Sequence, residues 1–249
     1  MAEARTFYRP KVRVAAEGSR VESWSRLTVT STAGFSMAVL VVPRPDEIDA
    51  DSQVEIQLDP GNGPETIFTG TVSEVYPHHG KRRYILEPAP RRALREIVEP
   101  SSWRKERSGN IAEEILKSAD NPFDTDLSAW PDVELRRFSV PQCSRHWALQ
   151  ALEHAVREAA GILTGRVVGP DGVLYLGPLE EIRREVASPV ALETGVNVIL
   201  RAGDNFNTFA FPVGYNQVVS VGDEDRLCTN ARLDIQPGRY RAGLVLEAL

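Results

Sequence analysis

The chain has 249 residues, of which 42% are hydrophobic and 26% are charged, and its formal net charge is −6. This composition suits one large or two modest globular domains. The negative charge argues against general nucleic-acid binding, which needs a basic surface. The sequence has no apolar run of about 18 residues, and we expect neither a membrane span nor secretion by the standard route.

The first third of the chain, residues 1–89, alternates between apolar and polar residues as β-strands do. Residues 54–58 alternate cleanly, and residues 66–76 predict a long strand with Gly70 near its middle. Residues 35–42 are apolar almost throughout, so they form either a doubly buried strand or a short helix. Such a meander must close into a small barrel or be completed by a neighbouring subunit, because unpaired edges invite other strands.

The middle, residues 90–185, changes to a helical period. Asn110 is expected to cap one helix. Ser144 is expected to cap a second helix, which Gly161 ends, and a hairpin is expected over residues 162–176. This part is therefore predicted to be an α+β insertion.

The last third, residues 186–249, returns to strands. The predicted strands cover residues 190–200, 206–211, 216–221 and 240–246. A short self-similarity places Gly70 over Gly243 when residues 67–74 are laid on residues 240–247. The match is short, but it is compatible with two related β domains.

The sequence thus predicts an α+β, mainly β fold, in which two small β-barrel-like domains flank an α+β insertion. The expected boundaries are residues 1–89 for the first barrel-like domain, 90–185 for the insertion and 186–249 for a second, shortened barrel.

Histidines are the first candidates for chemistry. His78 and His79 are adjacent in a turn, where neighbouring side chains do not readily chelate one ion, and no third ligand stands near them. His146 and His154 are eight residues apart on the second predicted helix, again without a cysteine or carboxylate at ligand spacing. We therefore expect no metal-binding residues.

The cysteines and carboxylates do not assemble a catalytic site either. Cys143 precedes a helix start, where the pKa of a thiol is lowered in some proteins, but no base and orienting partner surround it. Cys143 and Cys228 lie in unlike contexts, which favours reduced thiols. The pairs at 113–114 and 180–181 are two adjacent glutamates each, on segments expected to face solvent. We expect no catalytic residues, no cofactor and no enzymatic activity.

A basic stretch covers residues 91–107, where six Lys and Arg residues oppose three Glu residues. It is either a phosphate- or acid-binding surface or an ordinary charged face, and the ordinary face is favoured. Trp103 and Trp130 are expected in loops, filling cores or subunit contacts.

Several loose motifs follow one another in a recognisable order. They are Phe68-Thr69-Gly70-Thr71-Val72, Ile111-Ala112-Glu113-Glu114-Ile115-Leu116, Val140-Pro141-Gln142-Cys143-Ser144, Trp147-Ala148-Leu149-Gln150-Ala151-Leu152, Gly161–Arg166 and Asp171–Gly177. Their order over about residues 60–180 resembles the late control D-type tail hub proteins of bacteriophages, which are related to the hub part of type VI secretion spike proteins. Familiar hubs of this type are considerably longer than this chain.

The resemblance implies a structural baseplate hub subunit that acts as a homotrimer in the virion. Two barrels per chain would make a ring that joins the tail tube protein to the spike protein and contacts other baseplate proteins. It implies assembly in the bacterial host cytoplasm, no membrane partner and no sequence-specific nucleic acid, with a lumen through which DNA can pass.

Two alternatives remain open. The chain is another tail component, such as a distal tail or tube-initiator ring protein, or, less favoured, a tail-associated cell-wall hydrolase. The first would share the β content without the helical insertion, and the second would need a convergent set of acid, base or metal groups.

Overall fold

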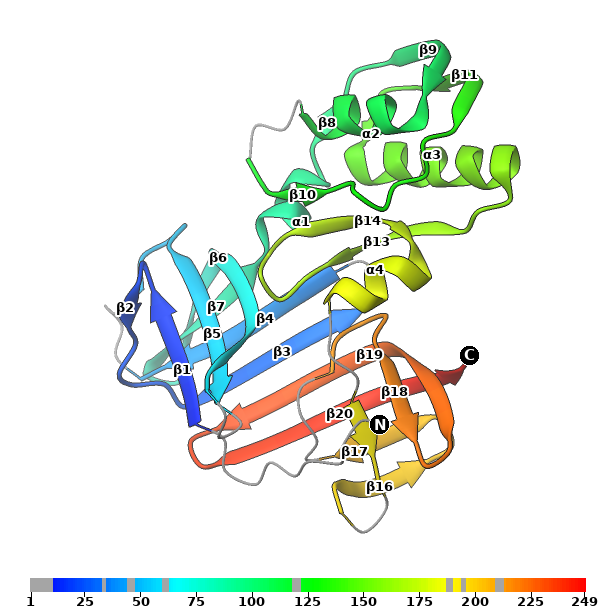
Figure 1. The fold of residues 1–249 in the computed structure, drawn as a ribbon. Coiled ribbons are helices and arrows are strands. Elements are labelled where there is room, and N and C mark those ends of the chain that lie inside the picture. Colours follow the sequence, from blue (N-terminus) through cyan, green and yellow to red (C-terminus); the bar gives the residue numbers. More distant parts are fainter. Residues whose placement is uncertain are drawn as a thin grey trace. The chain divides into compact units, whose positions relative to one another are not determined.

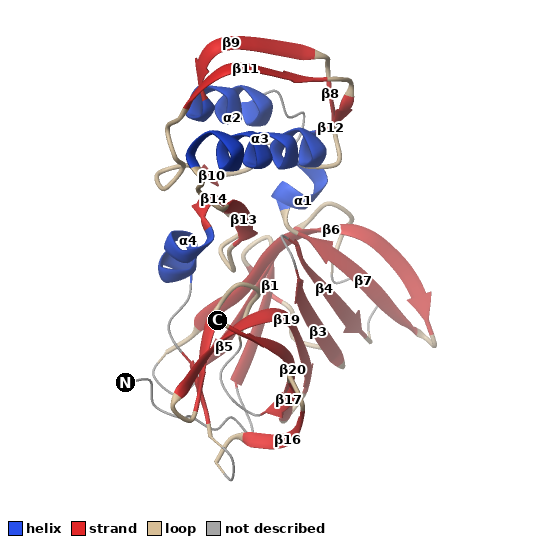
Figure 2. Ribbon diagram, turned by 90° about the vertical axis from the view of Figure 1, so that its right-hand side faces the viewer, coloured by secondary structure: helices blue, strands red, loops and turns tan. Residues whose placement is uncertain are grey.

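The computed structural model describes residues 11–32, 35–43, 48–59, 63–117, 122–186, 190–193, 196–208 and 213–249. The chain divides into two compact units. The sheet unit consists of Met1–Pro88 and Val186–Leu249, and the insertion unit consists of Ala89–Glu185. The fold is α+β and mainly β, as predicted (Figures 1 and 2).

The described strands of the sheet unit form one 13-stranded sheet. The strands are β1 (Lys11–Ala16), β2 (Ser19–Arg20), β3 (Arg26–Thr32), β4 (Phe35–Val42), β5 (Gln53–Asp59), β6 (Glu65–His78), β7 (Lys81–Glu87), β15 (Val190–Leu192), β16 (Val198–Ala202), β17 (Asn205–Thr208), β18 (Val218–Val221), β19 (Glu224–Gln236) and β20 (Arg239–Ala248). Their main order is β16-β17-β20-β19-β3-β4-β7-β6-β5-β1-β2, with β18 paired to β19 and β15 paired to β18. Because β16 and β2 do not pair with each other, the described strands form no closed barrel.

One pairing joins the two ends of the chain. β3 runs antiparallel to β19, with Leu27 opposite Ile235 at one end of the ladder and Thr32 opposite Asn230 at the other. The N-terminal and C-terminal segments therefore share a continuous sheet, which Figure 1 shows as the blue β3 beside the orange β19.

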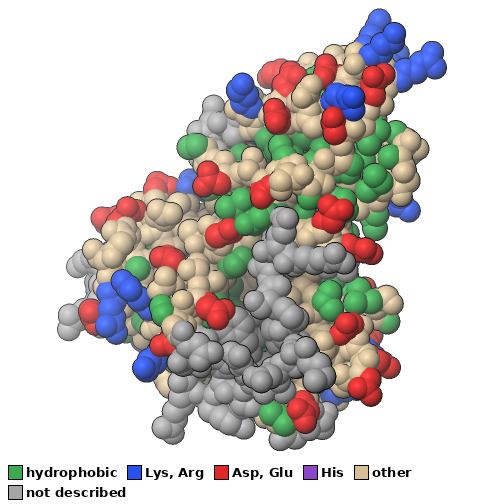
Figure 3. All heavy atoms as spheres, in the orientation of Figure 1, with side chains coloured by type: hydrophobic (Ala, Val, Ile, Leu, Met, Phe, Trp, Pro, Cys, Tyr) green, Lys and Arg blue, Asp and Glu red, His purple; other side chains and the backbone are tan. Residues whose placement is uncertain are grey.

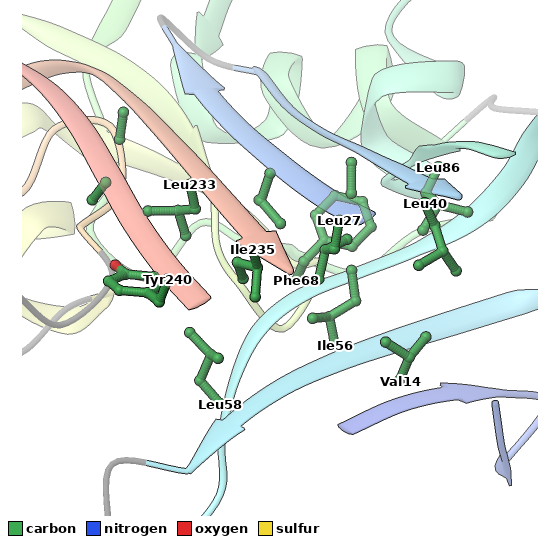
Figure 4. Close-up of a cluster of buried hydrophobic side chains, with 14 of the residues drawn as sticks. Val14, Leu27, Leu40, Ile56, Leu58, Phe68, Leu86, Leu233, Ile235 and Tyr240 are labelled. Atoms are coloured by element: carbon green, nitrogen blue, oxygen red, sulfur yellow. The ribbon is translucent and has the colours of Figure 1, made fainter. Parts of the chain in front are cut away.

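Alternating side chains on these strands form one hydrophobic core. In β5, Val54, Ile56 and Leu58 are fully buried, as their alternation predicted. The core also takes side chains from β3 and β19, including Leu27 and Ile235, so it crosses the junction between the two segments (Figure 4). Burying each aliphatic side chain of this size contributes about 1.5–3 kcal/mol.

The sheet resolves one open alternative of the sequence analysis and contains one strand that was not predicted. The apolar run 35–42 is a strand, β4, which pairs with β3 and β7. The long strand β19 was not predicted. A register shift between Cys228 and Asn230 interrupts the strand before its apolar alternation at Ala231, Leu233 and Ile235, and the first three residues of β19 are charged.

The insertion unit has three layers, which both ribbon views show (Figures 1 and 2). A two-stranded ribbon of β9 and β11 covers one side of helices α2 and α3, and the strands β10, β14 and β13 cover the other side. The elements are α1 (Ala89–Ala93), β8 (Ile97–Val98), β9 (Ser101–Arg107), α2 (Ser108–Lys117), β10 (Thr125–Asp126), β11 (Glu134–Val140), β12 (Cys143–Ser144), α3 (Arg145–Ala160), β13 (Thr164–Val168), β14 (Leu174–Pro178) and α4 (Leu179–Val186).

A buried arginine connects four elements of this unit. The Arg145 side chain is 1% exposed, and its Nε donates to the carbonyl of Ile115 at 2.6 Å. Its Nη1 donates to the carbonyl of Ala93 at 3.1 Å and to the carboxylate of Glu96 at 3.0 Å. A buried charge is tolerated only when it is paired and hydrogen-bonded, so these contacts fix α3 against α1, α2 and the residues before β8.

The caps of α3 confirm the sequence prediction, whereas the start of α2 does not. Ser144 is the N-cap and accepts a hydrogen bond from the amide of Trp147, and Gly161 ends the helix at φ 73°. α2 begins at Ser108, so Asn110 lies inside the first turn, and its side chain donates to Glu106 instead of capping the helix.

The two tryptophans of the middle region also have different positions. Trp103 was expected in a loop but lies in β9, where its ring stacks on Phe138 of β11 at 5.6 Å. Trp130 does lie between strands, and it is 7% exposed. The Trp103 ring therefore has a packing partner within the insertion unit, and the Trp130 side chain is buried.

The two glycines that the self-similarity superposes have different surroundings. A Cβ on Gly70 would lie 2.8 Å from the backbone of Glu87 and from the Phe68 ring, whereas a Cβ on Gly243 would meet its nearest atoms at 3.9 Å. We therefore expect Gly70→Ala to lower the free energy of unfolding by about 1–3 kcal/mol, because the backbone of Glu87 cannot move freely. Gly243→Ala, the matched control, should change it by less than about 0.5 kcal/mol. Urea unfolding measures both, and equal effects would contradict this reading of the two sites.

Candidate functional site

The histidines singled out in the sequence do not assemble a site. His78 ends β6 and His79 follows in the β6–β7 turn at φ 47°, with the two ring centroids 4.9 Å apart at an edge-on angle. His146 is half-buried beside Arg166, whereas His154 is exposed and lies 3.6 Å from Glu158. Among the residues that the structure describes, no group of three or more His, Cys, Asp or Glu side chains is placed to hold a metal ion.

The thiols and paired carboxylates are also separated from one another. Burial raises the pKa of the Cys143 thiol, so its position before the helix start does not lower that pKa. Burial raises the pKa of Cys228 to about 12. Glu114 accepts a hydrogen bond from the Trp103 ring nitrogen, so it serves the packing of α2 on β9. The expected absence of catalytic and cofactor-binding residues stays a prediction.

A buried charged cluster that the sequence did not indicate lies between α3 and β13. The Arg166 guanidinium is 3.1 Å from the Glu153 carboxylate and 3.5 Å from the His146 ring, and both charged side chains are largely buried. Burial raises the pKa of Glu153 to about 6, against the attraction of Arg166. Burial and Arg166 together lower the pKa of His146. The sequence carries two signals of this cluster. Residues 146 and 153 are spaced to share a face of the helix, and Arg166 is a charged residue on the next strand.

The most distinctive surface of the sheet unit is the edge strand β16. In the part of the chain that the structure describes, β16 pairs with β17 alone. Its residues Ile199 and Leu200 are 44% and 55% exposed, and Val196 just before it is 38% exposed. The strand register shifts at Ile199, so the regular alternation of side chains is interrupted here and two adjacent aliphatic side chains are exposed on this edge. Proteins usually guard such an edge with charged residues or cover it.

A bulge shapes how this edge can be used. The register with β17 shifts between Val198 and Leu200, so Ile199 has no residue directly opposite it. A bulge twists a strand and limits further ladder formation. A partner is therefore expected to contact β16 through the aliphatic side chains more than through a long backbone ladder.

Buried polar groups hold the edge strand in place. Asn197 and Thr208 are 1% and 0% exposed, and the Thr208 hydroxyl donates to the Asn197 carbonyl at 2.6 Å. The Asn197 side chain donates to the Ala191 carbonyl and accepts from the Glu193 amide, both at 2.9 Å. Buried hydrogen bonds of this kind are costly to break, so β16 presents its apolar side chains on a fixed support.

The described helices include none that is both long and apolar enough to cross a membrane.

The chain matches no protein-family model. No curated protein sequence matches it either.

Comparison of the fold with solved structures gives matches over almost the whole chain. The 43 kDa tail protein of prophage MuSo2 from Shewanella oneidensis has a TM-score of 0.69 at 11% identity, over 96% of this chain and 98% of that one. A tail protein from Neisseria meningitidis MC58 has a TM-score of 0.68 at 13% identity, over 96% of each chain. The E. coli c3393 protein, a type VI secretion component described as similar to the T4 phage tail proteins gp27 and gp5, has a TM-score of 0.62 at 9% identity, over 95% of this chain and 77% of that one.

These matches confirm the resemblance in fold that the motif order indicated. The chain has the fold of phage tail proteins and of a type VI secretion component. Because the sequence identities are only 9–13%, the likeness to these proteins is one of fold alone.

The buried Glu153 makes a testable prediction about pH. Between its ordinary pKa of 4.5 and about 6, the folded chain binds the Glu153 proton more tightly than the unfolded chain does. Its contribution to stability therefore falls as the pH rises through this window, by up to about 2 kcal/mol at ~1.4 kcal/mol per pKa unit. The difference in unfolding free energy between the natural chain and Glu153→Gln should fall by most of that amount from pH 4.5 to 7, because the unfolded carboxyl is already half ionised at pH 4.5.

Urea unfolding followed by tryptophan fluorescence is a suitable measurement, since Trp103, Trp130 and Trp147 all lie in the insertion unit. Glu158→Gln on the same helix is the matched control, because its side chain is 71% exposed and water screens its charge. A Glu153→Gln difference that stays constant across this pH range would contradict the assignment.

Proposed function

We propose that the protein is a structural subunit of a phage-type tail baseplate, a hub that assembles as a homotrimeric ring and joins the tail tube to the central spike. In this proposal it is a virion component without enzymatic activity. Its partners are further copies of itself, the tail tube protein, the spike protein and other baseplate proteins. DNA passes through the lumen without sequence-specific contacts.

The observation that carries the proposal is the extent of the fold likeness. The match to the Shewanella and Neisseria tail proteins covers 96% of this chain and nearly all of each of those chains. It therefore includes the sheet unit and the insertion unit together, and not one common β module. A spike-type partner is supported by the likeness to a type VI secretion component described as similar to gp27 and gp5.

The edge strand β16 supplies a physical reason to assemble. Exposed aliphatic side chains at Ile199 and Leu200 gain free energy when a neighbouring subunit removes them from water, at roughly 25 cal/mol per Å². A contact between two different surfaces of identical copies generates a closed ring when the rotation closes. We propose that β16 lies in such a contact and that the residue ranges 1–89 and 186–249 act as two barrel-like ring modules.

A distal tail or tube-initiator ring protein is the second candidate. It would also form rings, and the described helices of the insertion unit weigh against it, because that alternative was expected to lack them. The chain's place in a whole particle distinguishes the two, since a hub lies between tube and spike.

The ring predicts that the purified chain associates through β16. Mass photometry should find trimers or higher rings, and Leu200→Lys should weaken association by at least tenfold, because a desolvated lysine at an apolar contact is unfavourable. The fold should be retained, since an exposed substitution changes stability by about 0.5 kcal/mol or less.

Tyr76→Lys is the matched control, because Tyr76 is also an exposed large residue of the sheet unit, at 48% against 55% for Leu200. It should leave association within about twofold, far below the tenfold change that ~1.4 kcal/mol represents. Equal weakening by both variants, or a natural chain that stays monomeric at every concentration, would contradict the ring contact at β16.

The non-enzymatic part of the proposal has its own test. The purified chain should produce no clearing in a zymogram that contains bacterial cell walls. Clearing by this chain alone, lost when the protein is unfolded, would favour a tail-associated hydrolase instead.

A further inference from the structure

The β9–β11 ribbon carries a concentration of positive charge that the proposed ring does not yet use. Four exposed cations, Arg104, Lys105, Arg136 and Arg137, lie on its two strands and are called the basic ribbon below. Lys and Arg side chains project from this ribbon at the upper right of Figure 3. The chain as a whole has a net charge of −6, so the charge of the basic ribbon is opposite in sign to that of the whole chain.

The backbone is arranged so that all four side chains face solvent. A strand normally alternates between its two faces, yet both adjacent residues are exposed at Arg104 and Lys105 in β9 and at Arg136 and Arg137 in β11. The register stays regular on either side, with Glu106 opposite Leu135 and Arg104 opposite Arg137. The alternation therefore breaks in both strands at the same place.

This arrangement has two energetic costs. Lys105 has φ 50°, a left-handed conformation that costs a residue with a Cβ about 1–2 kcal/mol. Arg104 lies directly opposite Arg137, and like charges at such positions are destabilising. Strained backbone of this kind concentrates at functional sites, where the surrounding structure maintains it.

Nothing within the described chain compensates these charges. The side chains of the four cations form no hydrogen bond or ion pair with any described residue. The next cation along β9 differs, because Arg107 lies 3.3 Å from the Asp132 carboxylate. The four cations of the basic ribbon are therefore available to bind an anionic partner.

The surroundings of the ribbon favour protein carboxylates over nucleic acid. The exposed or half-exposed carboxylates of Glu106, Asp132 and Glu134 flank the four cations on the same two strands or beside them. A phosphate backbone that continued along the ribbon would meet these negative charges, whereas nucleic-acid surfaces are broadly basic. A small acidic surface of a protein can contact the four cations without reaching these flanking carboxylates.

The chain itself carries such a surface at the β18–β19 turn. Five exposed carboxylates gather there: Asp204, Asp223, Glu224, Asp225 and Glu247, called the acidic corner below. Arg226 joins two of them, at 3.0 Å from Asp204 and 3.1 Å from Glu224. The five carboxylates of the acidic corner outnumber its one arginine, Arg226, so the corner carries a net negative charge, opposite in sign to that of the basic ribbon.

We propose that the basic ribbon of one copy docks on the acidic corner of a neighbouring copy. The inference rests on the proposed ring and names a second contact within it. The two surfaces differ, so each copy gives its ribbon to one neighbour and receives a ribbon from the other, as a closed ring requires. Charge complementarity of this kind mainly sets the choice of partner, the register and the rate of association.

Charge reversal with rescue tests the docking. The ribbon variant Arg136→Glu/Arg137→Glu should weaken self-association at least tenfold in sedimentation velocity, and so should the corner variant Asp223→Lys/Asp225→Lys. Mixing the two variants, or combining them in one chain, should restore association to within a few-fold of the natural chain. The ribbon variant should fold well, because Arg137→Glu places a carboxylate opposite Arg104 and removes the repulsion.

Arg82→Glu/Arg83→Glu on β7 is the matched control, since it makes the same change in net charge at two exposed arginines of the sheet unit. It should leave association within about twofold, because a change of total charge alone is not what the contact depends on. Raising the salt concentration should weaken the natural chain and not the ribbon variant, since the screening length falls from about 30 Å at 0.01 M to about 3 Å at 1 M.

The outcomes separate the docking from the ring itself. If the natural chain and the ribbon variant form the same ring equally well, the docking is wrong and the ring stands. If the ribbon and corner variants both dissociate but do not restore each other, the pairing of these two surfaces is wrong. If the natural chain binds a short DNA duplex and the ribbon variant does not, while self-association is unchanged, the ribbon is a nucleic-acid surface. A natural chain that is monomeric throughout contradicts the ring and the docking together.

Discussion

The antiparallel pairing of β3 with β19 is the interaction on which the rest of the structure depends. It brings residues 27 and 235 opposite each other and joins the two ends of the chain into one sheet and one core. Closing so long a loop is entropically costly, and the apolar side chains buried along both strands offset that cost. Residues 89–185, which lie in the sequence between the two segments so joined, form a compact unit of their own.

The same pairing determines which surfaces remain for other molecules. With β3 and β19 in the interior, the main order of the described strands ends at β16 and at β2, and the side branch through β18 ends at β15. β16 carries exposed Ile199 and Leu200 on a support of buried hydrogen bonds, which is costly for a chain that remains alone in water. The insertion unit carries the opposite kind of surface, four cations on a strained ribbon that pair with no residue the structure describes. An apolar edge and a charged ribbon are both typical of assembly and not of catalysis, which needs convergent titratable groups.

Much of the local structure could be predicted from the sequence, because it depends on neighbouring residues. The caps at Ser144 and Gly161 and the alternation of Val54, Ile56 and Leu58 follow from spacing alone. β19 was missed because a register shift at Cys228 interrupts its alternation. The burial of Arg145 and the exposure of Ile199 and Leu200 were also missed, because both depend on which distant elements pack beside them. The sequence indicated the basic stretch 91–107. The other two cations of the basic ribbon lie on β11, about 30 residues later, and only strand pairing brings them beside β9.

The central proposal is that this chain is a ring-forming structural subunit whose exposed sheet edge lies between copies. Cryo-electron microscopy of the purified, assembled protein tests it most directly. The account predicts a closed ring of three copies in which β16 of each copy lies at a boundary with its neighbour. A particle in which Ile199 and Leu200 face solvent, or a preparation that contains single chains alone, would contradict it.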